Sequence, residues 1–123
     1  MANPNIVNVT SIYGNVANAS LTTTSATSLA SNAASSGVVF KVDNIVVANT
    51  TGSAANITIN VYSAAALGGT AYPIASSISV PAYSTLIVTD KSTAFYLMEN
   101  MSVGATAGTA SALVATISWE AIS

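Results

Sequence analysis

The acid, base and metal chemistry open to this sequence rests on very few side chains. A pair of carboxylates facing each other across a cleft could hydrolyse a glycosidic bond, and clustered oxygens could bind calcium. No Asp-x-Asp-x-Asp run is present, and Asp90 and Glu99 fall in expected turns, where polar residues are common. We therefore expect the acids to be structural or solvated, with a calcium site built from Asp90 and backbone carbonyls as the open alternative. The charged residues are Lys41, Asp43, Asp90, Lys91, Glu99 and Glu120.

The sequence also lacks the residues that other common catalytic and metal sites require. Nucleophilic catalysis needs a base beside the nucleophile, and the chain has no histidine and no cysteine for a Ser-His-Asp or Cys-His site. Zinc would lack its nitrogen and sulfur ligands, and no P-loop or Gly-x-Gly-x-x-Gly motif occurs. The sequence therefore predicts no enzyme, no cofactor, no metal site and no disulfide.

The low charge also limits the partners. A domain of 123 residues ordinarily carries about 30 charged groups, whereas this one has two cationic and four anionic residues. Charge repulsion keeps proteins apart in solution, so we expect much of this surface to contact other subunits. Two lysines are too few for nucleic acid or an anionic membrane, and no apolar run reaches the roughly 18 residues of a membrane span. The opening MANPNIVNVT lacks the basic and apolar regions of a Sec signal, which predicts a protein made in the cytoplasm and used there, or packaged into something assembled there.

Aromatic residues and the first segment are the candidate interaction residues. The tyrosines after residue 60 fall at outward or loop positions, where they could stack on a sugar or lie in a subunit interface, in which tyrosine is enriched. The interface fits the low charge better. Asn5–Tyr13 has apolar residues on both faces, which predicts a strand or an extended arm that is contacted on both sides. The predicted interface residues are Ile6, Val7, Val9, Ile12, Tyr13, Tyr62, Tyr72, Tyr83 and Tyr96, whereas Phe40, Phe95 and Trp119 are expected in the core.

The segment Val38–Ser63 predicts the elements that would position these residues. Its first arm, 38–48, is rich in β-branched residues, and its second arm, 56–63, alternates strictly between apolar and polar residues. Ile57, Ile59 and Val61 form one face, and Tyr62 ends the other. Alternation with period two indicates a strand with one buried face, and the Asn, Thr, Gly and Ser residues between the arms indicate a turn. We expect a β-hairpin here.

Further short strands are expected on both sides of this hairpin. Before it, a turn at Gly14-Asn15 and a strand over 20–28 are expected, with a short helix over 25–34 as the alternative. After it, a loop over 64–72 precedes strands over 73–80, 84–89, 93–98, 101–106 and 112–122, with Ile74, Ile78 and Val80 pointing inward. Regularly spaced short strands predict a single all-β domain. It would be an antiparallel β-sandwich, jelly-roll or Ig-like, of about eight or nine strands, with residues 1–13 as an arm or first strand and 14–123 as the sandwich.

Several turn motifs resemble those of a known group of proteins. The run FKVDNIVVANTTGSAANITINVY, then ISVPAYSTLIVTD, YLMEN, MSVGATAG and LVATISWEAI resemble small virion structural proteins of tailed phages, in particular capsid-associated proteins of marine cyanobacterial phages. The shared positions are turns: Asn49–Gly52, Val80–Ala82, Leu97–Asn100 and Trp119-Glu120. The opening NPNIVNVTSIYG extends the resemblance to the N-terminus.

The resemblance implies a sandwich that binds a capsid or another virion part without catalysis. The favoured expectation is a capsid decoration (cement) protein, a homo-oligomer such as a trimer, which binds the major capsid protein and is located in the virion. The first segment, Met1–Tyr13, would contact the capsid or exchange between subunits. A neck, tail or fibre component and a carbohydrate-binding module are the alternatives.

Overall fold

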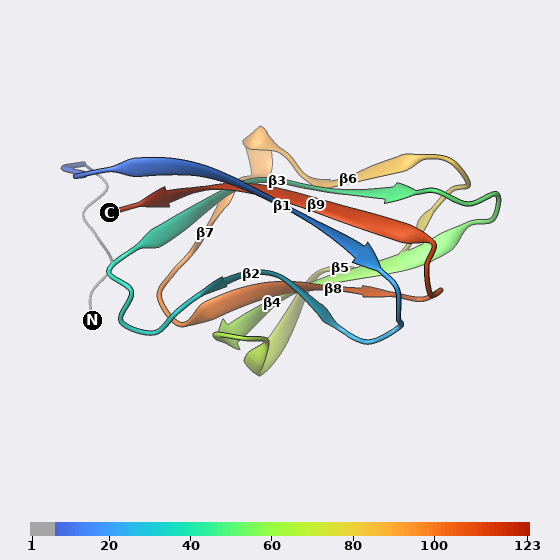
Figure 1. Ribbon diagram of the computed structural model, residues 1–123, viewed down its shortest axis with the longest axis horizontal. Coiled ribbons are helices and arrows are strands. Elements are labelled where there is room, and N and C mark those ends of the chain that lie inside the picture. The colour runs from blue at the N-terminus through green and yellow to red at the C-terminus, as the bar shows by residue number, and fades with distance from the viewer. Residues whose placement is uncertain (1–6) are drawn as a thin grey trace.

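The chain folds into two antiparallel β-sheets that pack face to face (Figure 1). The computed structural model describes residues 7–123. The upper sheet in Figure 1 has the strand order β1-β9-β3-β6, with β7 also paired to β3, and the lower sheet has the order β2-β8-β4-β5. The strands are β1 Ile12–Leu21, β2 Thr27–Asn32, β3 Val39–Asn49, β4 Ala55–Ala64, β5 Gly68–Val80, β6 Thr85–Thr89, β7 Phe95–Leu97, β8 Met101–Ala107 and β9 Leu113–Ile122, and a 3₁₀ turn, η1, spans Lys91–Thr93.

The strand pairing is that of a jelly roll. The pairs are nested along the chain: β1 pairs with β9, β2 with β8, β3 with β6 and β7, and β4 with β5, all antiparallel. β6 and β7 occupy the place of one strand, which η1 interrupts. A chain folded in half and wrapped around a barrel gives this nested order, whereas an Ig-like sandwich is built differently. The predicted all-β sandwich is therefore confirmed, and of its two forms the jelly roll is present.

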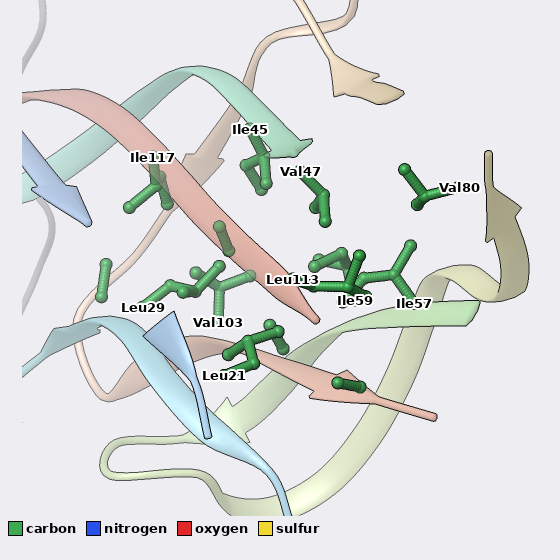
Figure 2. Packing of buried hydrophobic residues seen from close by; sticks show 14 of the residues in the cluster. Leu21, Leu29, Ile45, Val47, Ile57, Ile59, Val80, Val103, Leu113 and Ile117 are labelled. Atoms are coloured by element: carbon green, nitrogen blue, oxygen red, sulfur yellow. The ribbon is translucent and has the colours of Figure 1, made fainter. Parts of the chain in front are cut away.

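The core lies between the two sheets. In β9, Leu113, Ala115 and Ile117 are buried, and the residues between them are partly exposed. Figure 2 shows Ile117 of the upper sheet directed toward Val103 of the lower sheet. Half-buried Phe40, Phe95 and Trp119 pack against this cluster, as predicted, with the Phe40 and Trp119 ring centroids 5.6 Å apart. Alternation with period two therefore identified the buried face in most strands.

The prediction of a β-hairpin over Val38–Ser63 is wrong. Both arms are strands, β3 and β4, but β3 belongs to the upper sheet and β4 to the lower one, so they do not pair with each other. Because each arm has one apolar face, the two faces can pack together across the core as well as lie side by side. The connection between them crosses from one sheet to the other, and side-chain hydrogen bonds of the buried Asn49 hold it.

The first third of the chain also differs from the prediction. β1 begins at Ile12 and continues through Gly14-Asn15, where a turn was expected, because its pairing with β9 is unbroken from Ile12 to Leu21. The part of the expected first strand that the structure describes before Ser11 is not a strand. The predicted strand over 20–28 is divided by the connection between β1 and β2. The alternative helix over 25–34 is wrong, because β2 occupies most of that segment and pairs with β8.

The prediction of a loop over residues 64–72 is also wrong, because the connection is much shorter. Only residues 65–67 separate β4 from β5, and the paired Gly68-Gly69 begin β5, where Gly69 has a φ of 70°. The reversal itself is made by Ala66 and Leu67, whose φ angles of 57° and 59° are left-handed although neither residue is glycine. Gly69, just after the turn, adopts the same conformation without steric cost. Pro81 follows the last residue of β5, as predicted for a strand terminator.

Candidate interaction surfaces

β1 is a free sheet edge without the usual protection. Among residues 7–123 it is the outermost strand of the upper sheet and pairs only with β9. Its ten residues include no charged residue and no proline, which are the features that commonly prevent an edge strand from pairing with another chain. Three large apolar side chains on it, Ile12, Tyr13 and Val16, are exposed. This edge is therefore a candidate surface for association.

The segment before β1 lies next to the C-terminal residue. The amides of Thr10 and Ser11 donate hydrogen bonds to the carbonyl oxygen of Ser123, at 2.6 and 3.0 Å, and the Ser123 amide donates to the Ser11 carbonyl at 2.9 Å. The two serine hydroxyls are 2.7 Å apart. Among the predicted interface residues here, Val7 is 92% exposed, Val9 is half-buried and Ile6 lies outside the described residues.

The tyrosines predicted for an interface lie on several elements. Tyr72 on β5, Tyr83 in the β5–β6 connection and Tyr96 on β7 are exposed, as predicted. The Tyr83 ring lies over Gly52, within 3.6 Å of where a Cβ at that glycine would be. None of the three lies on β1: Tyr96 is at the opposite edge of the upper sheet, and Tyr72 is on the edge strand β5 of the lower sheet.

The exposure predicted for Tyr62 is wrong. Tyr62 points away from the core as expected, on the side of β4 whose cross-strand partner is Ser102, but only 8% of it is exposed. The turn 65–67 folds back over this face of the lower sheet. The Ser102 hydroxyl donates to the Ala64 carbonyl at 2.7 Å and accepts from the Leu67 amide at 2.9 Å. The Leu67 side chain and the Tyr62 ring both lie against Gly104.

Two residues predicted to face inward are exposed at the other edge. Ile74 and Ile78 on β5 are 45% and 43% exposed, although Ile78 is paired with the buried Ile57. β5 has 13 residues, but the facing edge strand of the upper sheet, β6, has only five. The inner face of β5 therefore extends beyond the short strand β6 that covers part of it. The alternation of residue types does not reveal how long the opposing strand is. Other exposed apolar residues that the interface prediction missed are Val16, Ile87 and Met98.

An apolar pocket opens beside this uncovered part of β5. It has a volume of about 330 Å³ and is lined by Ile74 of β5, by Val88 and Thr89 of β6, by Thr93, and by Phe95 of β7. The lining is mostly apolar, and the pocket lies at the edge where the two sheets end together. Only 6% of the Thr89 surface is exposed, and its hydroxyl has no hydrogen-bond partner.

The isolated Thr89 hydroxyl contrasts with the other buried polar side chains in the described part of the chain. The Asn32 amide donates to the carbonyls of Val38 and Leu97 at 2.8 and 3.1 Å. Asn49 and Ser102 make equally complete sets of bonds. Buried polar groups are nearly always paired, so an unpaired one requires an explanation. The Trp119 indole nitrogen is the second buried polar atom without a partner in residues 7–123.

Several charged residues take part in local hydrogen bonds and strand pairing. Asp90 caps η1: its carboxylate accepts hydrogen bonds from the Ser92 hydroxyl at 2.6 Å and the Ser92 amide at 3.0 Å. These bonds, and weaker ones from Thr93, lower the pKa of the Asp90 carboxyl. Glu99 accepts from the Gly37 amide at 3.2 Å, and Lys41 and Glu120 are cross-strand neighbours. No group of three or more Asp, Glu, His or Cys residues that could hold a metal occurs in residues 7–123.

Comparison with known proteins shows a likeness at the level of the fold. No family model and no curated protein matches the sequence. One similar solved structure comes from work on Bacillus endospore appendages, described there as a novel family of disulfide-linked pili. It has a TM-score of 0.54 and 17% sequence identity over 91% of this chain and 85% of that one. At this identity the likeness extends to the fold alone. Residues 7–123 contain no helix long and apolar enough to cross a membrane.

Proposed function

We propose that this chain is a non-catalytic structural subunit of a large protein assembly. The observation that carries the proposal is a nearly uncharged jelly roll with large apolar side chains exposed at both of its open edges. Exposed apolar residues combined with few charges favour association over solubility. The likeness to a subunit fold from a pilus supports this class of function.

Within this class, the proposed assembly is a tailed-phage virion, in which the chain is a capsid decoration protein. The support for this step is the resemblance of its turn motifs, such as Val80–Ala82, to small virion structural proteins. Each copy would bridge neighbouring capsid subunits and bury apolar surface that an undecorated lattice leaves in water. Many weak copies would then act together through multivalency. The protein would be made in the host cytoplasm, and its partners would be the major capsid protein and other copies of itself.

The copy number in the particle tests this proposal against its nearest alternative. Quantitative mass spectrometry of purified virions should find hundreds of copies per particle if the chain covers the head lattice. A handful would indicate a neck, tail or fibre component instead. Absence of the chain from the particles would overturn the virion proposal. A glycan array with no binding would remove the carbohydrate-binding alternative, which depends on the exposed tyrosines alone.

The first segment can be tested in the same particles. Because Ser11 is bonded to Ser123, and Ile12 and Tyr13 are paired within β1, removal of residues 1–13 would disturb the fold itself. A shorter deletion, 1–8, leaves these bonds in place. We expect the shortened protein to fold but to occupy heads lacking the native protein at reduced level, as measured by co-sedimentation. Full occupancy would show that the first segment does not contact the capsid.

A homopolymeric filament is the second candidate, favoured by the likeness to the pilus structure. That assembly is described as disulfide-linked, and this chain has no cysteine, so a filament of it would be held by non-covalent contacts alone. Negative-stain electron microscopy of the concentrated, purified chain distinguishes the two. Filaments formed by the chain alone would favour this candidate, and small oligomers that bind heads would favour decoration.

A further inference from the structure

Within residues 7–123, three of the four free sheet edges carry features that hinder pairing with another chain. The edge strand β5 contains Pro73 and has three register shifts against β4. The edge strand β2 has only six residues and a register shift against β8. The third edge is divided between the five-residue β6 and the three-residue β7, with η1 between them. Proline, bulges and short length are common protections of edge strands, so of these four edges only β1 is open to a further strand.

The pairing of β1 with β9 determines which backbone groups point to the free edge. Ser11 and Ser123 exchange two hydrogen bonds, of 3.0 and 2.9 Å, and so form a hydrogen-bonded pair. Such pairs alternate along an antiparallel ladder, and the β1–β9 register has no shift. The odd-numbered residues of β1 therefore direct their N–H and C=O groups to β9, and the even-numbered ones direct theirs outward. The outward residues, all of them exposed, are Ile12, Gly14, Val16, Asn18 and Ser20.

A second copy of β1 matches this edge in one antiparallel arrangement. A two-fold axis at Val16, the middle one of the outward residues, gives every one of them a partner in the other strand. Val16 then faces Val16 of the second copy, Gly14 faces its Asn18, and Ile12 faces its Ser20. An axis moved by one residue in either direction leaves Ile12 or Ser20 without a partner in β1. No like charges meet in this arrangement, because β1 has no charged residue.

The side chains on the other face of β1 are also complementary in this arrangement. The same axis places Tyr13 opposite Ala19 of the second copy, and Asn15 opposite its Ala17. These are non-hydrogen-bonded pairs, in which the two strands approach most closely. The large Tyr13 side chain, 68% exposed in the single chain, therefore lies against a small residue and loses exposed apolar surface. The size match on both faces favours a second copy as the occupant of this edge.

We propose that two copies of this chain join through their β1 strands, antiparallel and with the two-fold axis at Val16, so that their upper sheets form one continuous sheet. This inference rests on the proposed role as an assembly subunit and names one contact between copies. The contact is isologous, with the same strand on both sides, and so it closes after two copies. Larger assemblies would be built from this dimer through other surfaces.

Cysteine crosslinking of the purified full chain tests the partner and the register together, because the chain has no cysteine of its own. Hydrogen-bonded residues of antiparallel strands have Cα atoms about 5.5 Å apart, a distance that a disulfide spans. Val16→Cys should therefore oxidise to a covalent dimer. Asn18→Cys is the matched control on the same strand and should not crosslink with itself, since it faces Gly14. A mixture of Gly14→Cys and Asn18→Cys should give the mixed dimer.

A proline on the free edge tests the pairing of the backbones. Val16→Pro removes an N–H that points outward and leaves the bonds to β9 in place, which edge strands tolerate. Sedimentation equilibrium should show association weakened at least about tenfold, because the two-fold axis removes the bond twice. Melting should change little, whereas Ala17→Pro, which removes an N–H directed to β9, should melt lower. Val16→Thr keeps the N–H and the branched shape, and should associate within about threefold of the unmodified chain.

The possible failures are distinguishable. If the unmodified chain associates, but Val16→Pro associates equally well and Val16→Cys crosslinks no faster than Asn18→Cys, the β1 contact is wrong and the assembly role stands. Failure of the Gly14→Cys and Asn18→Cys mixture to crosslink would overturn the register with its axis at Val16. If the unmodified chain remains a monomer at high concentration, the contact between copies is wrong. The copy number in virions would then decide the assembly role separately.

Discussion

At the scale of single residues, Gly104 shows how a missing side chain supports the fold. A Cβ at this position would lie 2.7 Å from Leu67 Cδ2 and 3.1 Å from the Thr27 carbonyl oxygen. The glycine leaves space for the turn 65–67 to fold over the lower sheet, which in turn buries Tyr62. Tyr62 could not be assigned from sequence, because its burial depends on this turn and not on its own strand.

Gly104→Ala should therefore destabilise the domain by about 1–3 kcal/mol, the usual cost of adding a methyl group to a packed site. Urea unfolding followed by the fluorescence of Trp119, the single tryptophan, measures the free energy of unfolding. Gly14→Ala is the control, because nothing lies within 4 Å of its added Cβ. That variant should be neutral or gain up to roughly 1 kcal/mol. Equal effects at both glycines would contradict the packing explanation.

At the scale of the elements, the β3–β4 connection depends on Asn49. Its amide nitrogen donates to the carbonyls of Ser53 and Val80, at 2.8 and 3.0 Å, and its oxygen accepts from the Thr51 amide at 2.9 Å. Asn49 thus joins the connection to the end of β5. This network holds a crossing between sheets, although the same residue types would serve a hairpin turn.

Asn49→Ala should cost at least about 1–3 kcal/mol, because it leaves buried polar groups unpaired. Asn56→Ala, on the exposed side of β4, should stay within about 0.5 kcal/mol of the unmodified chain. Urea midpoints of the two variants measure the difference. Similar midpoints would show that the connection is held by something other than the Asn49 side chain.

The η1 cap should give the stability a dependence on acid pH. Hydrogen bonds from Ser92 lower the pKa of the Asp90 carboxyl in the folded chain, whereas in the unfolded chain it is about 3.9. The stability that Asp90 contributes is therefore complete above that value and is lost as the pH falls through the lower, folded value. The difference in melting temperature between the unmodified chain and Asp90→Ala should shrink between pH 6 and pH 2.5. A constant difference would mean that protonation of Asp90 does not matter.

The elements also show which parts of the structure could be predicted from sequence. Alternation located β4, β7 and β9 and their buried faces, because burial on one side of a strand determines residue type directly. It could not determine which strands pair, since β3 and β4 would have the same pattern in a hairpin or across a sandwich. It also could not predict that Ile74 and Ile78 are exposed, because this depends on the length of β6. The pocket around Thr89 was missed for the same reason, as it combines residues from β5, β6 and β7.

At the scale of the whole molecule, only six of the 123 residues are charged, so we expect association to depend little on the screening of charges by salt. Salt weakens contacts between exposed charges over about 8 Å at physiological ionic strength, but the β1 edge and the pocket lining contain no charged residue. Self-association should therefore change less than about twofold between 50 and 500 mM NaCl. Sulfate, which strengthens apolar burial, should increase it. Sedimentation equilibrium across a salt series gives both results.

A single lysine at the free edge should change this behaviour. Val16→Lys places a charge on β1, where natural edge strands often carry one to prevent pairing with other chains. We expect it to weaken association and leave the melting temperature nearly unchanged, because Val16 is exposed. Thr109→Lys adds the same charge in the connection between β8 and β9 and serves as the control for net charge. If both lysines weaken association equally, the whole molecule's charge governs assembly; an effect confined to Val16→Lys assigns assembly to the β1 edge.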